Sequence, residues 1–402
     1  MQHLVIVGGG HLAAALITGL YKHDFDGQVT LLSAEGSLPC NRPVLSKEYL
    51  KGELTEEGLE LIAEHIWSDP RFSYQLNTQV SEINRQQKTV VANGHPIPYD
   101  QLVLATGTTP RRLDIPGHEL ANIHYLKTLS DAKKLRGALQ PGKRLAVIGG
   151  GFIGLEIAAA ARQAGMAVTL LEAGQRVLGR VVAPEVSDYF LRLHQAQGVE
   201  IRTGVGVENF MGQQAIEAVR LTNGEVLAAD QVVVGIGVVP EVSLAQQAGL
   251  ECDNGIVIDQ SCRTSDPAIH AGGDCAIQFS PLYNRNLRLE SVQNTSAHAQ
   301  VILAELTGQP IPTSAVPWFW STQYEARLQI AGLSLDYDQL ITRGQDTQAR
   351  SWLYLKQGRL IACDAINRPA DFLQAKKMIL TETRIDCHKA EDINIPLNRC
   401  IA

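Results

Sequence analysis

Apolar residues along most of this chain fall into short continuous runs, separated by segments in which apolar positions recur with helical periodicity. Strands that are buried on both faces of a parallel sheet are apolar throughout, so a run, a helical segment and a second run predict a βαβ unit. The sequence contains two such sets, at residues 3–7, 12–22 and 28–33 and at residues 144–148, 152–163 and 167–172. The pattern therefore predicts an α/β protein with two separate parallel sheets.

The remaining pattern predicts where the domains begin and end. A buried run at 101–105 is followed by a turn rich in Gly, Thr, Pro and Arg, which marks a boundary near residue 110. A run at 232–237 closes the second unit, and the chain then returns to the first. From about Trp318, short alternating runs precede a helix near 372–380, which predicts an antiparallel sheet with a packed helix. We expect three domains, formed by residues 1–110 with 241–315, by 111–240 and by 316–402.

Composition and charge narrow the class of protein. At 402 residues, the chain exceeds what one hydrophobic core usually serves. A formal net charge of −7 gives no cationic footprint for nucleic acid. We expect no membrane association, because no apolar run reaches spanning length and the first residues do not resemble a secretory leader. The seven cysteines are an odd number without CxxC spacing, which argues against a disulfide framework and favours a reducing cytoplasm.

The first glycine-rich turn follows the first predicted strand. Gly8, Gly10 and Ala13 form GxGxxA between a strand and a helix, which lets a pyrophosphate approach the backbone at the N-terminus of the helix. Glu35, shortly after the second strand, is the candidate for binding a ribose hydroxyl. Arg42 and Lys47 lie in a proline-constrained segment, where they either contact phosphates or a flavin ring or form a solvated basic loop.

The second glycine-rich turn is a full GxGxxG, formed by Gly149, Gly151 and Gly154. Glu172 lies 23 residues after the first of these glycines, at the end of the next strand. A carboxylate at this position binds ribose hydroxyls and repels a 2′-phosphate, so we expect NADH rather than NADPH. Arg176 and Arg180 leave NADPH as the alternative, because a nearby arginine can bind that phosphate.

Six further motifs occur in order along the chain. They are LSK at 45–47, ATG at 105–107, GGDCA at 272–276, RLESVQN at 288–294, VPWFWSTQY at 316–324 and INRPADF at 366–372. With the glycine turns, they cover essentially the whole chain, which resembles the FAD-dependent ferredoxin reductases of the putidaredoxin reductase family that serve Rieske oxygenases and haem monooxygenases. The resemblance implies a glutathione-reductase-like fold: two interleaved Rossmann-like dinucleotide-binding domains and a C-terminal α+β domain.

The resemblance also implies a set of site residues, with FAD in the first domain and NADH in the second. Asp274 is expected to bond the ribityl hydroxyls of FAD. The expected FAD contacts are Gly8, Gly10, Leu12, Ala13, Glu35, Arg42, Lys47, Val80, Ala105, Thr106, Gly107, Lys127, Asp274, Glu290 and Val292. The expected NADH contacts are Gly149, Gly151, Ile153, Gly154, Glu172, Arg180 and Gly237. The chain departs from the family pattern at Cys40, Lys127, Ala297 and Thr322, and the last two bear on the tuning of the flavin.

The implied reaction passes a hydride from NADH to FAD and single electrons to a 2Fe-2S ferredoxin that serves an oxygenase. The cofactors carry this chemistry, so it needs no protein nucleophile and no metal site. Lys47, Glu156 and Trp320 are the candidate catalytic residues. Glu156 either positions the nicotinamide or complements the dipole at a helix start. Trp320 either stacks near the flavin or nicotinamide ring or is a core tryptophan.

Two other functions remain open from the sequence. Cys40 lies early in the FAD domain, which is compatible with a flavin-dependent peroxide, persulfide or disulfide reductase. A redox-sensing interaction protein is the second alternative. The sequence gives no role to His11 or His298, and Cys363 is expected to be a buried strand residue. For docking an acidic ferredoxin, the candidate basic residues are Arg285, Arg288 and Arg327.

Overall fold

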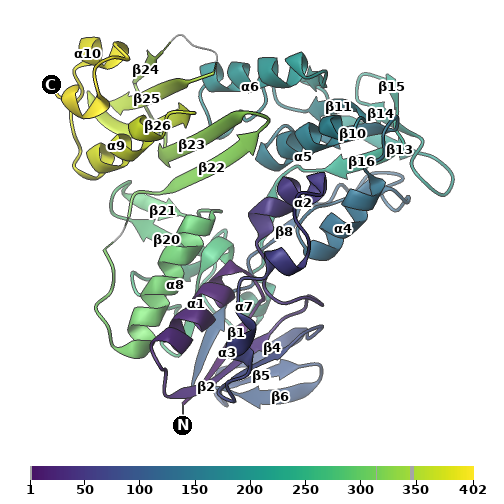
Figure 1. The fold of residues 1–402 in the computed structure, drawn as a ribbon. Coiled ribbons are helices and arrows are strands. Elements are labelled where there is room, and N and C mark those ends of the chain that lie inside the picture. Colours follow the sequence, from purple (N-terminus) through teal and green to yellow (C-terminus); the bar gives the residue numbers. More distant parts are fainter. Residues whose placement is uncertain (1, 314, 345–347) are drawn as a thin grey trace. The chain divides into compact units, whose positions relative to one another are not determined.

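The computed structural model describes residues 2–313, 315–344 and 348–402, which form two compact units. The first unit comprises Met1–Asn41, Thr55–Thr109 and Val238–Ala315. The second comprises Arg42–Leu54, Pro110–Gly237 and Val316–Ala402. Figure 1 traces the chain through both units.

The first unit is built on a five-stranded parallel sheet with the order β19-β7-β1-β2-β3. The chain adds β2 and β3 on one side of β1, and β7 and β19 on the other. Open α/β sheets bind ligands at such a reversal, beyond the carboxyl ends of the strands. The strands are β1 (Gln2–Val7), β2 (Gly27–Leu32), β3 (Phe72–Gln75), β7 (Gln101–Leu104) and β19 (Ile269–Ala271).

Two helices of this unit pack side by side, α1 (His11–Lys22) and α8 (Val292–Thr307) (Figure 1). Gly19 allows the close approach, because a Cβ there would lie 2.6 Å from a methyl group of Leu303. The smaller elements of the unit are α3 (Glu64–Trp67), α7 (Ser243–Gln247), an antiparallel sheet of β4 (Val80–Asn84), β5 (Thr89–Ala92) and β6 (His95–Pro98), and a mixed sheet of β18 (Ile256–Ile258), β20 (Ala276–Ser280) and β21 (Arg285–Leu287).

The second unit repeats the parallel architecture, with the strand order β12-β11-β10-β16-β9. The strand order again reverses beside its first strand, β10. The strands are β9 (Ile123–His124), β10 (Arg144–Ile148), β11 (Ala167–Glu172), β12 (Glu200–Thr203) and β16 (Gln231–Val234). The helices are α4 (Leu129–Ala138), α5 (Phe152–Gln163) and α6 (Pro184–Ala196), and β13 (Val207–Met211), β14 (Ala218–Leu221) and β15 (Val226–Ala228) form a small antiparallel sheet.

A five-stranded antiparallel sheet completes the second unit, in the order β22-β23-β26-β25-β24. Its strands are β22 (Trp318–Gln323), β23 (Ala326–Gly332), β24 (Gln339–Arg343), β25 (Arg350–Lys356) and β26 (Arg359–Ile366), and α9 (Pro369–Leu380) and α10 (Cys387–Glu391) complete this part. One hydrophobic cluster joins this sheet to the parallel part: Phe190 of α6 and Trp352 of β25 belong to it. The Tyr189 and Trp352 rings meet edge to face with centroids 6.2 Å apart. The antiparallel sheet therefore shares a core with the parallel part of the same unit.

A short segment from early in the chain also belongs to the second unit. It contains the 3-10 turn Arg42–Ser46 and α2 (Glu48–Lys51), and it packs against α4 and α5. The guanidinium of Arg136 lies 5.1 Å from the centre of the Tyr49 ring. The chain passes between the units near β8 (Thr108–Pro110) and β17 (Val238–Pro240), which pair as a two-stranded sheet.

The predicted fold class is confirmed, and the elements differ from their predicted bounds by a few residues. The last long helix begins at Pro369 rather than near 372, because proline is well tolerated in the first helical turn. The run at 232–237 remains extended only to Val234, where a glycine turn begins. In the part of the chain that the structure describes, no helix has both the length and the apolar character to cross a membrane.

Candidate functional site

The first glycine turn lies at the carboxyl end of β1, where the strand order of its sheet reverses. Gly8 has φ +113°, a conformation that other residues rarely adopt, and a Cβ on it would overlap the carbonyl oxygen of Ala105. Gly10 is the N-cap of α1 and provides no side-chain cap for the helix. No side chain of the N-cap residue competes for the N-terminus of α1, and a glycine turn that leads into a helix N-terminus is the arrangement that binds a pyrophosphate. The turn fits a dinucleotide.

Ala105, Thr106 and Gly107 lie beside this turn, because β7 pairs with β1 through Val7 and Leu104. The Thr106 hydroxyl donates to the carbonyl oxygen of Glu241 over 2.7 Å, which ties the segment to the returning chain. Leu12 and Ala13, in the first turn of α1, are buried.

Glu35 and Val80 belong to the same unit. Glu35 is partly buried in the loop after β2, where its backbone N–H donates to the Ser33 hydroxyl at 3.2 Å and its carbonyl accepts from Asn77 at 3.1 Å. Val80 is buried at the start of β4. The loop that carries Glu35 is thus fixed by backbone hydrogen bonds.

Asp274 follows a second glycine-containing turn, at the carboxyl end of β19. Gly273 has φ +72°, and its backbone N–H donates to Nδ1 of His298 at 3.0 Å. Burial lowers the pKa of His298 to about 4, so the ring is neutral and can accept this bond. Arg288 donates to the carbonyl oxygen of Asp274 at 3.1 Å. This role of His298 could not be predicted from the sequence, because no local pattern indicates a contact between a helix and a turn 25 residues away.

The start of α8 carries the last of the predicted FAD contacts. Val292 is its first residue, and the hydroxyl of Ser291 accepts from the Asn294 amide at 3.2 Å. Glu290 pairs with Arg288 at 2.7 Å. This ion pair and the 11% exposure of the Arg288 side chain mean that Arg288 does not offer a free charge for docking.

The second glycine turn follows β10 and has the same geometry. Gly149 has φ +106°, and a Cβ on it would overlap the carbonyl oxygen of Gly235. A Cβ on Gly154 would overlap the carbonyl oxygen of Gly149, so this glycine lets the helix approach the strand. Gly151 is the N-cap of α5 without a side-chain cap, and Ile153 is 44% exposed in the first turn. This turn also fits a dinucleotide.

Glu172 at the end of β11 is bound to the glycine turn. One carboxylate oxygen accepts from the Gly150 amide and the other from the Gly174 amide, each at 2.6 Å. Arg176 donates to the carbonyl oxygens of Val182 at 2.7 Å and Gly179 at 2.9 Å. The guanidinium of Arg176 is thus already engaged by backbone groups.

Arg180 and Gly237 are neighbours in this unit. Arg180 is exposed, and a Cβ placed on Gly237 would lie 3.5 Å from its guanidinium nitrogen. Gly237 has φ +98°, which favours glycine.

Two of the predicted residues of the second unit, Lys47 and Glu156, form a compact polar cluster with Ser46 and Ser321. Lys47 Nζ lies 2.9 Å from Oε2 of Glu156, and their side chains are 11% and 4% exposed. The Ser46 hydroxyl donates to the same oxygen at 2.5 Å, and the Ser321 hydroxyl donates to Oε1 at 2.6 Å. Arg42 donates to the backbone oxygen of Lys127 at 3.2 Å. Glu156 is therefore a buried, ion-paired carboxylate, and it lies beyond the first turn of α5, where a carboxylate would complement the helix dipole.

Trp320 precedes Ser321 on β22. Its ring lies 5.9 Å from that of Trp318 and 6.3 Å from that of Phe319, between centroids. Phe319 in turn lies 4.7 Å from Phe152, the first residue of α5. Trp320 is only partly buried, so it differs from a core tryptophan such as Trp352.

The cysteine considered for one of the alternative functions is buried. Cys40 is 4% exposed, and its backbone bridges that of Glu60. Cys363 is buried in β26, as predicted. None of the cysteines in the described ranges forms a disulfide, and within these ranges no group of His, Cys, Asp and Glu could hold a metal ion.

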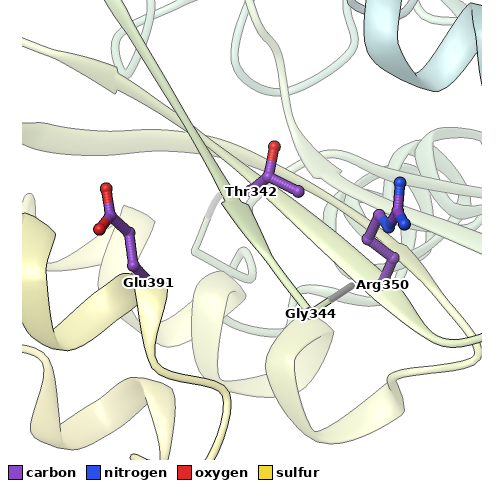
Figure 2. Close-up of a pocket in the computed structure, with 4 residues that line it drawn as sticks. All are labelled: Thr342, Gly344, Arg350 and Glu391. Carbon is purple, nitrogen blue, oxygen red and sulfur yellow. The ribbon is translucent and has the colours of Figure 1, made fainter. Parts of the chain in front are cut away.

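Figure 2 shows a cavity in the antiparallel part of the second unit. It has a volume of about 510 Å³ and is lined by Thr342 and Gly344 near the end of β24, Arg350 of β25 and Glu391 of α10. None of the predicted site residues is among these four.

Comparison with known proteins places this geometry in a family. Residues 2–305 match the model of the pyridine nucleotide-disulphide oxidoreductases, and residues 318–401 match the reductase C-terminal model. The chain belongs to the pyridine nucleotide-disulphide oxidoreductase family. Within this family, it is 42% identical to a putidaredoxin reductase from Pseudomonas putida, over all of this chain and 97% of the relative.

Two solved structures of the family are also similar. The reductase in a covalent putidaredoxin reductase–putidaredoxin complex superposes with a TM-score of 0.96 at 42% identity, covering 99% of this chain and 97% of the other. A ferredoxin reductase for the CYP199A2 system from Rhodopseudomonas palustris gives a TM-score of 0.95 at 36% identity, with full coverage of both chains. The resemblance inferred from the ordered motifs is thus confirmed.

Proposed function

We propose that this chain is a flavoprotein that takes a hydride from NADH onto FAD and passes electrons singly to a 2Fe-2S ferredoxin. The observation that carries the proposal is the pair of glycine turns, each at the point where the strand order of a parallel sheet reverses and each followed by an uncapped helix. A protein that binds two dinucleotides is equipped to pass electrons between them. The similar proteins named above are reductases of ferredoxin-type partners, which supports the same acceptor for this chain.

In this proposal, residues 1–110 and 241–315 bind FAD, residues 111–240 bind NADH, and residues 316–402 form the C-terminal domain. The Gly8 turn and the start of α1 hold the pyrophosphate of FAD, and Glu35 binds a ribose hydroxyl. Asp274 binds the ribityl hydroxyls from a turn that His298 holds through Gly273. The N-terminus of α8 at Val292 directs its dipole toward the flavin ring, where it favours negative charge.

The Gly149 turn and the start of α5 hold the pyrophosphate of NADH, and Glu172 accepts bonds from the adenosine ribose. The backbone bonds of Glu172 orient its carboxylate toward the turn. Arg176 would have to give up two backbone bonds before it could bind a 2′-phosphate. Arg180 remains the one of these two arginines with an exposed side chain. The arrangement favours NADH over NADPH.

Lys47, Glu156 and Trp320 then act on the nicotinamide and the flavin. Lys47 and Glu156 form a fixed, low-exposure charge pair that positions the nicotinamide and excludes water from it. Trp320 offers an aromatic face to a ring system. FAD held by these residues would supply the chemistry that connects a two-electron donor to a one-electron acceptor, because a flavin can take up an electron pair and give up electrons singly. Oxidation of one NADH thus reduces two ferredoxin molecules and releases a proton.

The ferredoxin would in turn serve a Rieske oxygenase or a haem monooxygenase. We place the protein in the cytoplasm, because cysteines without disulfides suit a reducing compartment. The sulfur-based alternative requires a thiol that can meet its substrate, and Cys40 is largely shielded.

The experiment that tests the proposal combines spectroscopy with a choice of acceptors. The purified protein should be yellow, with the absorption bands of FAD, and NADH should reduce it in the absence of oxygen. Turnover should then depend on a 2Fe-2S ferredoxin. A protein that turns over NADH with peroxide or a disulfide but with no ferredoxin would contradict the proposal.

A further inference from the structure

The Glu156 carboxylate lies at the end of a longer buried chain of hydrogen bonds. Ser321, which donates to Glu156, accepts from the side-chain amide of Gln323 at 3.1 Å. The amide oxygen of Gln323 lies 2.8 Å from Nε2 of His194. The Ser321, Gln323 and His194 side chains are 0%, 1% and 0% exposed. This chain of hydrogen bonds therefore joins α5, β22 and α6 without contact with solvent.

The carboxylate dictates the direction of every bond in this chain. A carboxylate only accepts, so the Ser321 hydroxyl must donate to it, and the oxygen of Ser321 is then left to accept from the amide nitrogen of Gln323. The amide oxygen of Gln323 must in turn accept from His194. The His194 ring is thus fixed in the tautomer with its proton on Nε2, and its Nδ1 has no hydrogen-bond partner among the described residues. Burial lowers the pKa of His194 to about 4, which keeps the ring neutral.

The same chain fixes the position of β22. Ser321 and Gln323 are two residues apart, so they lie on one face of the strand, while Trp320 and Thr322 lie on the other. Bonds from Ser321 to α5 and from Gln323 to α6 hold the strand at two successive points of this face. The backbone that carries Trp320 is therefore held by the same bonds that orient Glu156.

We propose that Gln323 and His194 are positioning residues for the reaction with NADH, acting through Ser321 on Glu156 and through β22 on Trp320. The inference rests on the proposed function of Glu156 and Trp320 at the nicotinamide. It assigns a role to two residues, 129 positions apart in sequence, that need not touch either cofactor.

The test interrupts the chain of hydrogen bonds by replacing both members of the Gln323–His194 pair, so that neither side chain of this pair is left buried without a partner. The double variant Gln323→Met with His194→Leu replaces both partners by apolar side chains, which costs much less stability than removing one of them. The matched control is the double variant Tyr354→Phe with Asp364→Val, which also replaces both partners of a buried hydrogen bond in the same antiparallel sheet. The Tyr354 hydroxyl donates to Asp364 and accepts from the amide of Ala183, and among the described residues none of the side-chain hydrogen bonds of Tyr354 and Asp364 leads to Glu156.

The double variant is expected to bind FAD and to melt close to the unmodified protein. Its flavin should be reduced about tenfold more slowly at saturating NADH, which is the loss expected when one oriented hydrogen bond is misplaced. Ser321→Ala should slow the step by a similar factor, and combining it with the double variant should add little, because all three residues act in one chain. The control variant Tyr354→Phe with Asp364→Val should react at the original rate. A double variant that keeps the original reduction rate would overturn the inference.

A second measurement does not depend on turnover. Nitrogen-15 spectra of histidine-labelled protein, assigned with His194→Gln, should show His194 as a neutral ring protonated at Nε2. The Nε2 signal should shift in Ser321→Ala. A His194 protonated at Nδ1, or a signal that Ser321→Ala leaves unmoved, would contradict the hydrogen-bond chain. If instead the unmodified protein is not reduced by NADH while its His194 signals are as expected, the proposed function fails and the positioning role falls with it.

Discussion

Replacement of Glu172 by alanine is expected to change which dinucleotide the protein prefers. Glu172 is partly exposed, and its two carboxylate oxygens accept from one backbone amide in the glycine turn, that of Gly150, and from one in the loop after β11, that of Gly174. In the proposed complex, the same carboxylate accepts from the ribose hydroxyls of NADH. Alanine removes these bonds, and it also removes the negative charge that opposes the 2′-phosphate of NADPH.

The magnitude follows from these two effects. A hydrogen bond to a charged group contributes about 1.5 to 3 kcal/mol, so the affinity for NADH should fall by roughly tenfold to a hundredfold. Two unit charges about 4 Å apart repel by roughly 4 kcal/mol in a medium of effective dielectric constant 20, and solvent reduces this at a partly exposed site. NADPH should therefore gain on the order of tenfold. The ratio of kcat/KM for NADH to that for NADPH should fall by at least about a hundredfold.

The assay is steady-state reduction of a 2Fe-2S ferredoxin with each dinucleotide. Glu172→Gln is the matched control, because it removes the charge and keeps one oxygen that can accept the Gly150 amide. It should lose less affinity for NADH than the alanine variant, and it should gain a similar amount with NADPH. An alanine variant with an unchanged preference between NADH and NADPH would refute the role given to Glu172.

Three other outcomes are expected. Gly8→Ala should yield protein without FAD, because the added methyl group would overlap a backbone carbonyl and φ is +113°. The control Gly137→Ala should keep its flavin, because the added methyl group meets no atom within 4 Å. Visible absorption spectra of the two purified variants measure the difference in bound flavin. Cys40→Ser should retain ferredoxin reduction, and its loss would favour the sulfur-based alternative. Acid should destabilise the fold, because burial lowers three histidine pKa values from 6.5 to about 4, so that the unfolded state binds more protons between these values. The free energy of unfolding is then at its full value above about pH 6.5 and falls as the pH is lowered toward 4, by up to about 1.4 kcal/mol per pH unit for each histidine. Urea unfolding measured between about pH 6.5 and about pH 4 tests this, and a free energy of unfolding that does not change over this range would contradict it. The three are His194, His270 and His298.

Local sequence patterns predicted the fold and the two glycine turns, because the residues that determine these features are neighbours in the sequence. Each glycine turn follows its strand by a few residues, and both positive φ values and the close approach to a neighbouring carbonyl are requirements of the turn itself. The alternating pattern after Trp318 likewise predicted an antiparallel sheet, since the period of a strand is visible in a few residues.

The surroundings of Glu156 could not be predicted in this way. Its partners Ser46 and Ser321 lie 110 and 165 residues away in sequence, and His194 reaches it only through two further side chains. Serine, glutamine and histidine carry no periodic signal when they are buried in pairs from different elements. The role of Glu156 was expected only through family resemblance, and its ion pair with Lys47 became visible only in the structure.

In the proposed reaction, electrons enter as a pair from NADH and leave singly to a ferredoxin through one bound flavin. The decisive measurement is an anaerobic titration of the purified protein with NADH, first alone and then in the presence of excess oxidised 2Fe-2S ferredoxin. We expect NADH alone to bleach bound FAD, and we expect two molecules of ferredoxin to be reduced for each NADH consumed. A colourless protein, or a flavin that NADH reduces but that leaves the ferredoxin oxidised, would contradict it.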